Sequence, residues 1–259
     1  MKVYEAAQII EEKIPKNLAY AWDNVGLLVG GGDKPVKRVY LTLDTNIKTI
    51  NEAVSAGADM IISHHPMFFN PIKRIVYGTP EGDAVKMLIE NGIAVYAAHT
   101  NMDVAPGGIN DRLARMLGLE NIKVLEKNDI CDGAGLGRYG DLPQPQKYSE
   151  FVKRVSELLR TPVRYTGDES RMISKAAVGS GACAELVEPA QNNMCDVLIT
   201  ADMKYHQMID ADERGICLID AGHYPTEVCV IEIFEEILKD SGLEIIKSTN
   251  TDIFKFFGA

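Results

Sequence analysis

The order of hydrophobic and polar positions along this chain predicts strands and helices in alternation. Short apolar runs rich in branched residues are followed by segments of helical period, many of which end at glycine. This pattern indicates an α/β fold with mixed, largely parallel sheets. The expected strands are 38–43, 59–62, 93–98, 175–178, 196–199 and 216–219, and the expected helices are 47–56, 81–90, 109–117, 148–160, 184–193 and 227–239.

A segment rich in Gly, Pro and Gln, residues 131–146, interrupts this alternation and is expected to be a loop. We therefore expect two α/β lobes, residues 1–125 and 126–259, with the last helix and strand packing back on the first lobe. Residues 38–66 also align without a gap over residues 175–203. Internal duplication and a shared strand–helix–strand pattern explain this match equally well.

Composition restricts the kinds of partner. The chain has 259 residues, of which 46% are hydrophobic, so a large core is expected. The formal net charge of −10 argues against a broad nucleic-acid surface, although a nucleotide held through metal ions remains compatible with it. No apolar run reaches the roughly 18 residues of a membrane span. The N-terminal segment is an amphipathic helix with acidic residues, unlike a secretion signal, so a cytoplasmic protein is expected.

The five histidines are confined to four short motifs. These motifs are SHHP (63–66), HTNMD (99–103), KYH (204–206) and GHYPTE (222–227). Three of them directly follow an expected strand, at the edge where α/β proteins place their ligands. Imidazole and carboxylate groups bind divalent metals through nitrogen and oxygen. The chain is therefore expected to bind metal.

The spacing inside the motifs suggests two ions. His64 and His65 are adjacent, and consecutive side chains of an extended segment point to opposite sides, so each is expected to reach a different ion. His99 and Asp103 are separated by about one helical turn, as are His223 and Glu227. Carboxylates can bridge two cations. Because no thiolate belongs to the set, Zn, Mn, Fe, Co and Mg all stay open.

Taken in order, these motifs resemble the NIF-three-like family of dinuclear metal proteins, whose members are commonly called GTP cyclohydrolase I type 2 homologs. The opening WDNVGLLVG and the closing STNTDIFKFF also match, so the resemblance covers essentially the whole chain. It implies two α/β lobes that enclose a two-metal cleft, and a toroidal homohexamer built as a trimer of dimers. The metal ligands that the resemblance implies are His64, His65, Asp103, His223 and Glu227.

Other residues are candidates for substrate binding or proton transfer. His99 is expected as a further metal contact or a catalytic neighbour of the ions. The backbone N–H groups of Gly179, Ser180 and Gly181 could hold an anion at a helix start, although a plain tight turn fits the same sequence. Lys204 and His206 could donate to substrate or transfer protons, and they fit ordinary surface positions equally well.

The expected activity is that of a metal-dependent hydrolase acting on a small molecule or nucleotide. For the GTP cyclohydrolase reaction that the resemblance implies, a metal-activated water would attack C8 of guanine and open the imidazole ring. An aromatic content of 7% and a single Trp indicate no obvious platform for stacking a base. A phosphoesterase would need the same metals, and a non-enzymatic metal-binding or regulatory interaction protein would use the same ligands.

Overall fold

The computed structural model describes residues 1–257, which form two compact units. Unit 1 consists of Met1–Met102 and Val230–Thr251, and unit 2 consists of Asp103–Cys229 and the described residues that follow Thr251. Residues 103–125, which the strand–helix alternation assigns to the first lobe, therefore belong to unit 2. Within the described residues, no helix combines the length and the apolar character needed to cross a bilayer.

Unit 1 is built on a five-stranded sheet. Its strand order is β1-β4-β3-β2-β11, and all neighbours are parallel except the antiparallel pair β1 and β4. Because β2, β3 and β4 are parallel, their carboxyl ends lie at one edge of the sheet. The strands are β1 (Gly26–Val29), β2 (Arg38–Thr42), β3 (Met60–Ser63), β4 (Ala94–Ala97) and β11 (Glu244–Lys247).

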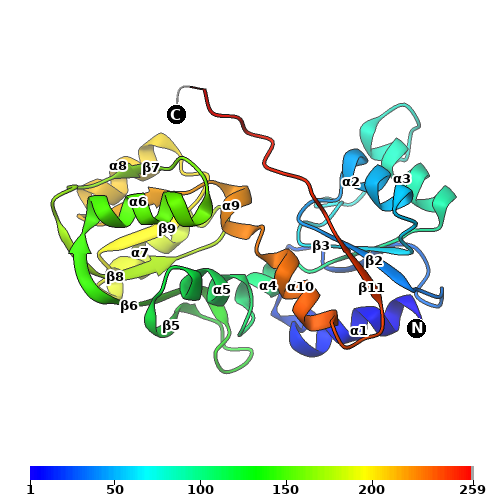
Figure 1. Cartoon of the computed structure of the whole chain (residues 1–259), viewed down its shortest axis with the longest axis horizontal. Coiled ribbons are helices and arrows are strands. Elements are labelled where there is room, and N and C mark those ends of the chain that lie inside the picture. The colour runs from blue at the N-terminus through cyan, green and yellow to red at the C-terminus, as the bar shows by residue number, and fades with distance from the viewer. Residues whose placement is uncertain (258–259) are drawn as a thin grey trace. The chain divides into compact units, whose positions relative to one another are not determined.

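Helices cover both faces of this sheet (Figure 1). Tyr40, Ile61 and Val95 pack against α2 (Ile47–Ser55) and α3 (Pro80–Asn91). The alternate strand positions are equally buried and face α1 (Val3–Lys13) and α10 (Val230–Leu238). Burial on both faces explains why these strands read as continuous apolar runs rather than as alternating ones. Unit 1 also contains the 3-10 helix η1 (Lys16–Leu18).

Unit 2 is built on a six-stranded sheet of order β5-β6-β8-β9-β10-β7. Only the neighbours β8–β9 and β9–β10 are parallel, so the expectation of largely parallel sheets holds for unit 1 and is wrong for unit 2. The strands are β5 (Glu120–Lys127), β6 (Gly135–Lys147), β7 (Arg164–Thr166), β8 (Met172–Val178), β9 (Val197–Thr200) and β10 (Cys217–Asp220).

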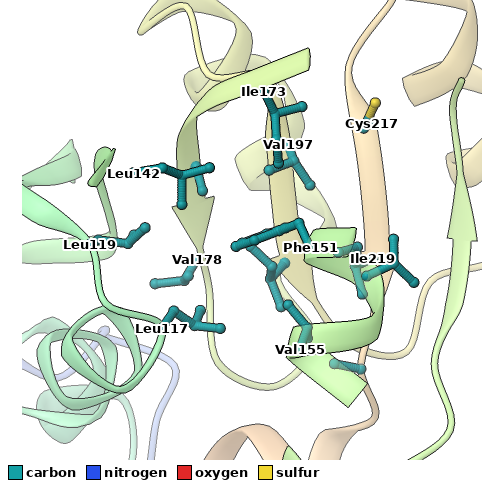
Figure 2. Close-up of a cluster of buried hydrophobic side chains, with 14 of the residues drawn as sticks. Leu117, Leu119, Leu142, Phe151, Val155, Ile173, Val178, Val197, Cys217 and Ile219 are labelled. Atoms are coloured by element: carbon teal, nitrogen blue, oxygen red, sulfur yellow. The ribbon is translucent and has the colours of Figure 1, made fainter. Parts of the chain in front are cut away.

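Two hydrophobic clusters lie on the two faces of the unit 2 sheet. Figure 2 shows the cluster in which Phe151 and Val155 of α6 (Tyr148–Leu159) pack against Val197 and Ile219. Helix α5 (Ile109–Met116) lies on the same face. The opposite face is covered by η2 (Ala184–Leu186), α7 (Val187–Asn192) and α8 (Tyr205–Glu213).

The expected loop 131–146 is wrong over most of its length, because β6 occupies Gly135–Lys147. Its glycines fit a strand with close neighbours: a Cβ at Gly140 would collide with the Glu120 carbonyl oxygen of β5. Its two prolines fall where the register with β8 shifts, between Asp141 and Gln146. A bulge tolerates proline because the ladder does not need its missing N–H there.

The two units share a local hydrogen-bond arrangement at the aligned aspartates. Asp59 accepts hydrogen bonds from the N–H groups of Lys37 and Arg38 at 2.8 and 2.9 Å. Lys37 immediately precedes β2, and Arg38 is its first residue. Asp196 accepts in the same way from Ser174 and Lys175 within β8 at 2.8 and 3.0 Å. Each aspartate thus ties the start of one strand to its parallel neighbour. A common strand–helix–strand pattern produces this likeness with or without duplication.

Candidate metal centre

Three histidines gather at the carboxyl-terminal edge of the unit 1 sheet. His64 and His65 directly follow β3, and His99 lies two residues after the end of β4. Their ring centroids are 5.0 Å (His64–His65), 5.2 Å (His64–His99) and 5.6 Å (His65–His99) apart. Each ring offers a nitrogen, and these nitrogens lie within 4.8 Å of one another. This group is close enough to hold a metal ion.

The Nδ1 atom of each of these rings is already engaged. His64 Nδ1 lies 2.9 Å from the Ala98 carbonyl oxygen, which can only accept, so Nδ1 carries the proton. His65 Nδ1 lies 2.7 Å from Asp44 Oδ1, and His99 Nδ1 lies 2.9 Å from Asp23 Oδ1. With Nδ1 donating, Nε2 is the ring atom that can act as a metal ligand. Carboxylate or carbonyl support of this kind is typical of metal-binding histidines.

Asp23, which supports the His99 ring, is a buried carboxylate with a shifted pKa. Its side chain is fully buried against His99 and accepts from both the backbone and the hydroxyl of Thr100. Burial alone would raise the pKa of Asp23, but the hydrogen bonds from His99 and Thr100 lower it from 3.8 to about 2. Asp23 therefore stays ionised and fixes the orientation of the His99 ring.

The lowered pKa of Asp23 predicts acid sensitivity of the metal-free protein. A carboxylate whose pKa is depressed on folding stabilises the fold above its unfolded pKa, and this contribution is lost as the pH falls from about 4 towards 2. Asp23→Asn should therefore be destabilised by up to about 2 kcal/mol at neutral pH, and this deficit should shrink over that window. Urea unfolding in the presence of chelator, repeated across this pH range, measures the loss of stability. Asp33→Asn is the control, since the Asp33 side chain is 87% exposed. A constant deficit at all pH values would contradict the assignment.

Unit 2 contributes an imidazole and two carboxylates. The short helix α9 (His223–Glu227) begins three residues after the end of β10 and places His223 Nε2 3.0 Å from Glu227 Oε2. His223 Nδ1 lies 2.7 Å from Asp202 Oδ2, so its ring is supported as those of unit 1 are. Glu227 is only 4% exposed and Asp103 only 8%. Buried carboxylates of this kind need a counter-charge.

The loop after β8 connects these two carboxylates. Ser180 donates its hydroxyl to Asp103 Oδ1 at 3.2 Å. The next residue, Gly181, has φ +62°, and a Cβ there would collide with Glu227 Oε1. Glycine is therefore required so that the backbone can approach the Glu227 carboxylate. Asp103 and Glu227 thus lie against consecutive residues of one loop.

Two helices of one turn each account for the spacing seen in the sequence. His99 immediately precedes α4 (Thr100–Val104), and Asp103 lies within it. His223 and Glu227 are the first and last residues of α9. The expected helix 227–239 is interrupted after Glu227, and α10 begins at Val230. The predicted separation of about one turn is confirmed for both motifs.

The Gly179–Gly181 loop uses its backbone N–H groups inside the protein. Gly179 donates to the Ile199 carbonyl at 2.9 Å, Ser180 to Asn110 Oδ1 at 2.8 Å and Gly181 to Thr226 Oγ1 at 3.0 Å. The interpretation of these N–H groups as an anion site therefore does not agree with the structure, in which the loop supports the carboxylates.

Lys204 and His206 lie at the start of α8, where both are exposed. His206 packs edge-on against Tyr205, with ring centroids 5.5 Å apart. Within residues 1–257, His206 does not join any group of side chains close enough to share a metal. Its proposed part in proton transfer stays a prediction.

Sequence reasoning missed the three aspartates that support the histidines. Asp44 lies two residues after β2, and Asp202 lies two residues after β9. Each therefore sits at the end of the parallel strand next to the one that carries its histidine. An aspartate shortly after an apolar strand is the signal that could have identified them. Asp23 belongs to the WDNVG motif, but its partner His99 is 76 residues away.

These features define an α/β protein with clustered histidines and carboxylates, and comparison with known proteins supplies the family. Residues 1–253 match the model of the Duf34/NIF3 family (NGG1p interacting factor 3), and the chain belongs to that family. It is 36% identical to a "GTP cyclohydrolase 1 type 2 homolog" of Clostridium acetobutylicum, with 99% of each chain covered. A protein of the same description from Methanocaldococcus jannaschii is 35% identical and covers 95% of this chain and 98% of its own.

Solved structures show the same fold. A hypothetical protein of Staphylococcus aureus superposes with a TM-score of 0.91 at 28% identity, over 99% of each chain. A Bacillus cereus protein related to NIF3 gives a TM-score of 0.90 at 26% identity, again over 99% of each chain. The predicted family is confirmed.

Proposed function

We propose that the protein is a hydrolase that uses two divalent metal ions. His64, His65 and His99 of unit 1 and the Asp103, His223 and Glu227 group of unit 2 would hold these ions together. The observation that carries the proposal is the common state of the four rings: every Nδ1 is held by an aspartate or carbonyl oxygen, so that Nε2 is presented as a ligand.

The donor set suits hard or borderline cations. It consists of imidazole nitrogens and carboxylate oxygens, which Zn, Mn, Fe, Co and Mg accept. The nearby Cys183 thiol is a poor competitor, because burial, reinforced by the Asp103 carboxylate, raises its pKa well above the ordinary value. Asp103 and Glu227 bring two negative charges into a buried setting, where bound cations would offset them.

Chain connectivity supports a joint site. α4 contains the last residues of unit 1 and the first of unit 2, so His99 and Asp103 are tied together by one helical turn. We propose that the histidine group and the carboxylate group bind the same pair of ions.

The residues of the chain would bind the ions and orient the imidazole ligands, and the ions would supply the chemistry. When bound, two ions lower the pKa of a shared water and stabilise the developing negative charge. Asp103 and Glu227 would help to hold the cations, while Asp23, Asp44 and Asp202 hold the imidazoles in one tautomer and orientation. Such carboxylate support fixes the ring orientation in which each imidazole can bind metal.

The substrate that we propose is a nucleotide, with GTP as the first candidate. The name of the relatives, GTP cyclohydrolase 1 type 2 homolog, motivates this choice. In that reaction water adds to C8 of guanine and the imidazole ring opens. The homohexamer stays a prediction from the family resemblance.

A second candidate function is metal-dependent binding without catalysis. The family description, NGG1p interacting factor 3, refers to an interaction rather than to a reaction. The same ligands would then serve a regulatory or metal-carrying role.

Reloading the stripped protein with metal separates the two functions. Chelator-treated protein is reloaded with Zn, Mn, Fe, Co or Mg in turn and incubated with GTP and a panel of phosphoesters. The hydrolase proposal expects about two ions per chain and many turnovers with at least one ion, and none in the stripped protein. Uptake of two ions with no turnover of any compound would favour the binding function. Failure to take up any ion would contradict both.

A further inference from the structure

Three aromatic side chains form a wall beside His99 in unit 1. The rings of Tyr20 and Trp22 are stacked, with centroids 5.7 Å apart and an interplanar angle of 19°. Phe69 lies 5.5 Å from Trp22 at 41°. Trp22 and Phe69 each meet the His99 ring edge-on at a centroid distance of 6.3 Å. We call Tyr20, Trp22 and Phe69 the aromatic wall.

Much of this wall faces solvent. Trp22 is 57% exposed and Phe69 is 53% exposed, although both are residue types that normally contribute to cores. Large exposed aromatic surface next to polar groups is typical of a binding site. The sequence suggested no obvious platform for stacking a base, whereas the structure brings these three rings together. Trp22 and Phe69 are 47 positions apart in the chain, and only the fold brings them together.

Hydrogen bonds fix the wall to the segments that carry the histidines. The Tyr20 N–H donates to Thr100 Oγ1 at 3.1 Å, and the Asp23 N–H donates to the Tyr20 carbonyl at 3.0 Å, which closes a turn around Trp22. On the other side, the Asn24 side chain donates to the Phe68 carbonyl at 2.6 Å. The wall is therefore held in place before any ligand arrives, which reduces the entropy lost on binding.

We propose that Trp22 and Phe69 bind a planar heteroaromatic ring, such as the base of a purine nucleotide, and place it beside His99. The proposal rests on the proposed function, because it names the part of the substrate that this side of the site would recognise. A base stacked at van der Waals distance, about 3.5–4 Å, would lie close to the histidine group. Stacking on an aromatic side chain contributes about 1–3 kcal/mol per base, and it tolerates different bases because each has a π-face.

The chain carries its own reporter, because Trp22 is the only tryptophan in the sequence. Its emission, excited at the red edge where guanine absorbs little, is followed while GTP, guanosine or tripolyphosphate is added to metal-loaded protein. Guanosine has the base without phosphates, and tripolyphosphate has phosphates without the base. GTP and guanosine should change the emission saturably, and tripolyphosphate should leave it unchanged.

Substitutions test the wall without touching any proposed ligand. Phe69→Ala keeps the reporter and should weaken GTP binding at least about 5-fold, in proportion to the lost stacking. Trp22→Ala should do the same when binding is measured by calorimetry, and Trp22→Phe should restore most of the affinity. Tyr77→Ala is the matched control: this ring of unit 1 is 67% exposed and lies outside the wall. Its affinity for GTP should equal that of the wild type.

Metal content separates this inference from the proposed function. The wall variants should retain wild-type metal content, because none of the replaced residues offers a ligand atom. Emission changes with GTP and guanosine support the wall even if no turnover is found. Unchanged emission with both compounds, or equal GTP affinity of Phe69→Ala and wild type by calorimetry, would overturn it even if the protein proves to be a metal-dependent hydrolase.

Discussion

A Glu227→Gln variant is expected to fold normally and to lose most of its affinity for metal. Glu227 is buried beside His223, and its carboxylate is one of the two acidic ligands that we propose for the ions. Glutamine keeps the shape but removes the charge that a divalent cation needs. Changing a residue that only supports a ligand typically costs 10–100-fold in affinity, so loss of a ligand should cost at least about 100-fold.

Thermal unfolding with and without metal gives a direct measurement. Metal that binds only the folded state raises the melting temperature of the wild type, and this increase should vanish in the variant. The metal-free variant should remain folded, because glutamine keeps the shape of the side chain and its amide can still form a hydrogen bond with His223. Glu188→Gln is the matched control, because Glu188 is exposed in the same unit, and it should behave as the wild type. Equal metal content of Glu227→Gln and wild type would contradict the ligand assignment.

An Arg138→Met variant is expected to destabilise unit 2 by about 3–5 kcal/mol. The Arg138 guanidinium is 2% exposed and forms an ion pair with Asp111 at 2.8 Å. It also donates to the carbonyls of Gly135, Gly137 and Ala105 at 2.7, 2.8 and 3.3 Å. Methionine would fill the volume but leave a carboxylate and several carbonyl groups without this donor, and unsatisfied buried groups carry the full cost of desolvation.

Arg115→Met provides a control that shares the same partner. Arg115 lies 3.8 Å from Asp111 and is 61% exposed, so its removal should cost less than about 1 kcal/mol. Denaturant unfolding of the two variants compares a buried ion pair with an exposed one, and both pairs involve the Asp111 carboxylate. If both substitutions cost the same, the buried network around Arg138 does not stabilise the fold as proposed.

The sequence predicted the elements that carry the histidines because their patterns are local. The apolar runs that became β3, β4 and β10 are short and continuous, and each is followed within three residues by a histidine. Helical spacing between His223 and Glu227 was equally readable, since one turn brings such residues to one side of a helix. Elements without a clear period were missed. β6 contains two prolines and several glycines, and β7 has only three residues.

The partners of the histidines could not be predicted in the same way. Asp44 supports His65 across two neighbouring parallel strands, and Asp23 supports His99 from 76 residues away. These pairings depend on strand order and on the packing of the segment before β1, which no local pattern encodes. The aromatic wall is of the same kind, because Trp22 and Phe69 belong to separate loops.

The sequence by itself thus determined the α/β class, the family and the set of side chains that can bind metal, because hydrophobic period and motif spacing are properties of neighbouring residues. The tertiary structure alone decided which carboxylate orients which imidazole, that the Gly179–Gly181 loop supports Asp103 and Glu227, and that the single tryptophan lies exposed beside His99. The physical reason is that hydrogen bonds, ring contacts and close backbone approach depend on distances in space, and sequence spacing fixes those distances only within a turn or a strand.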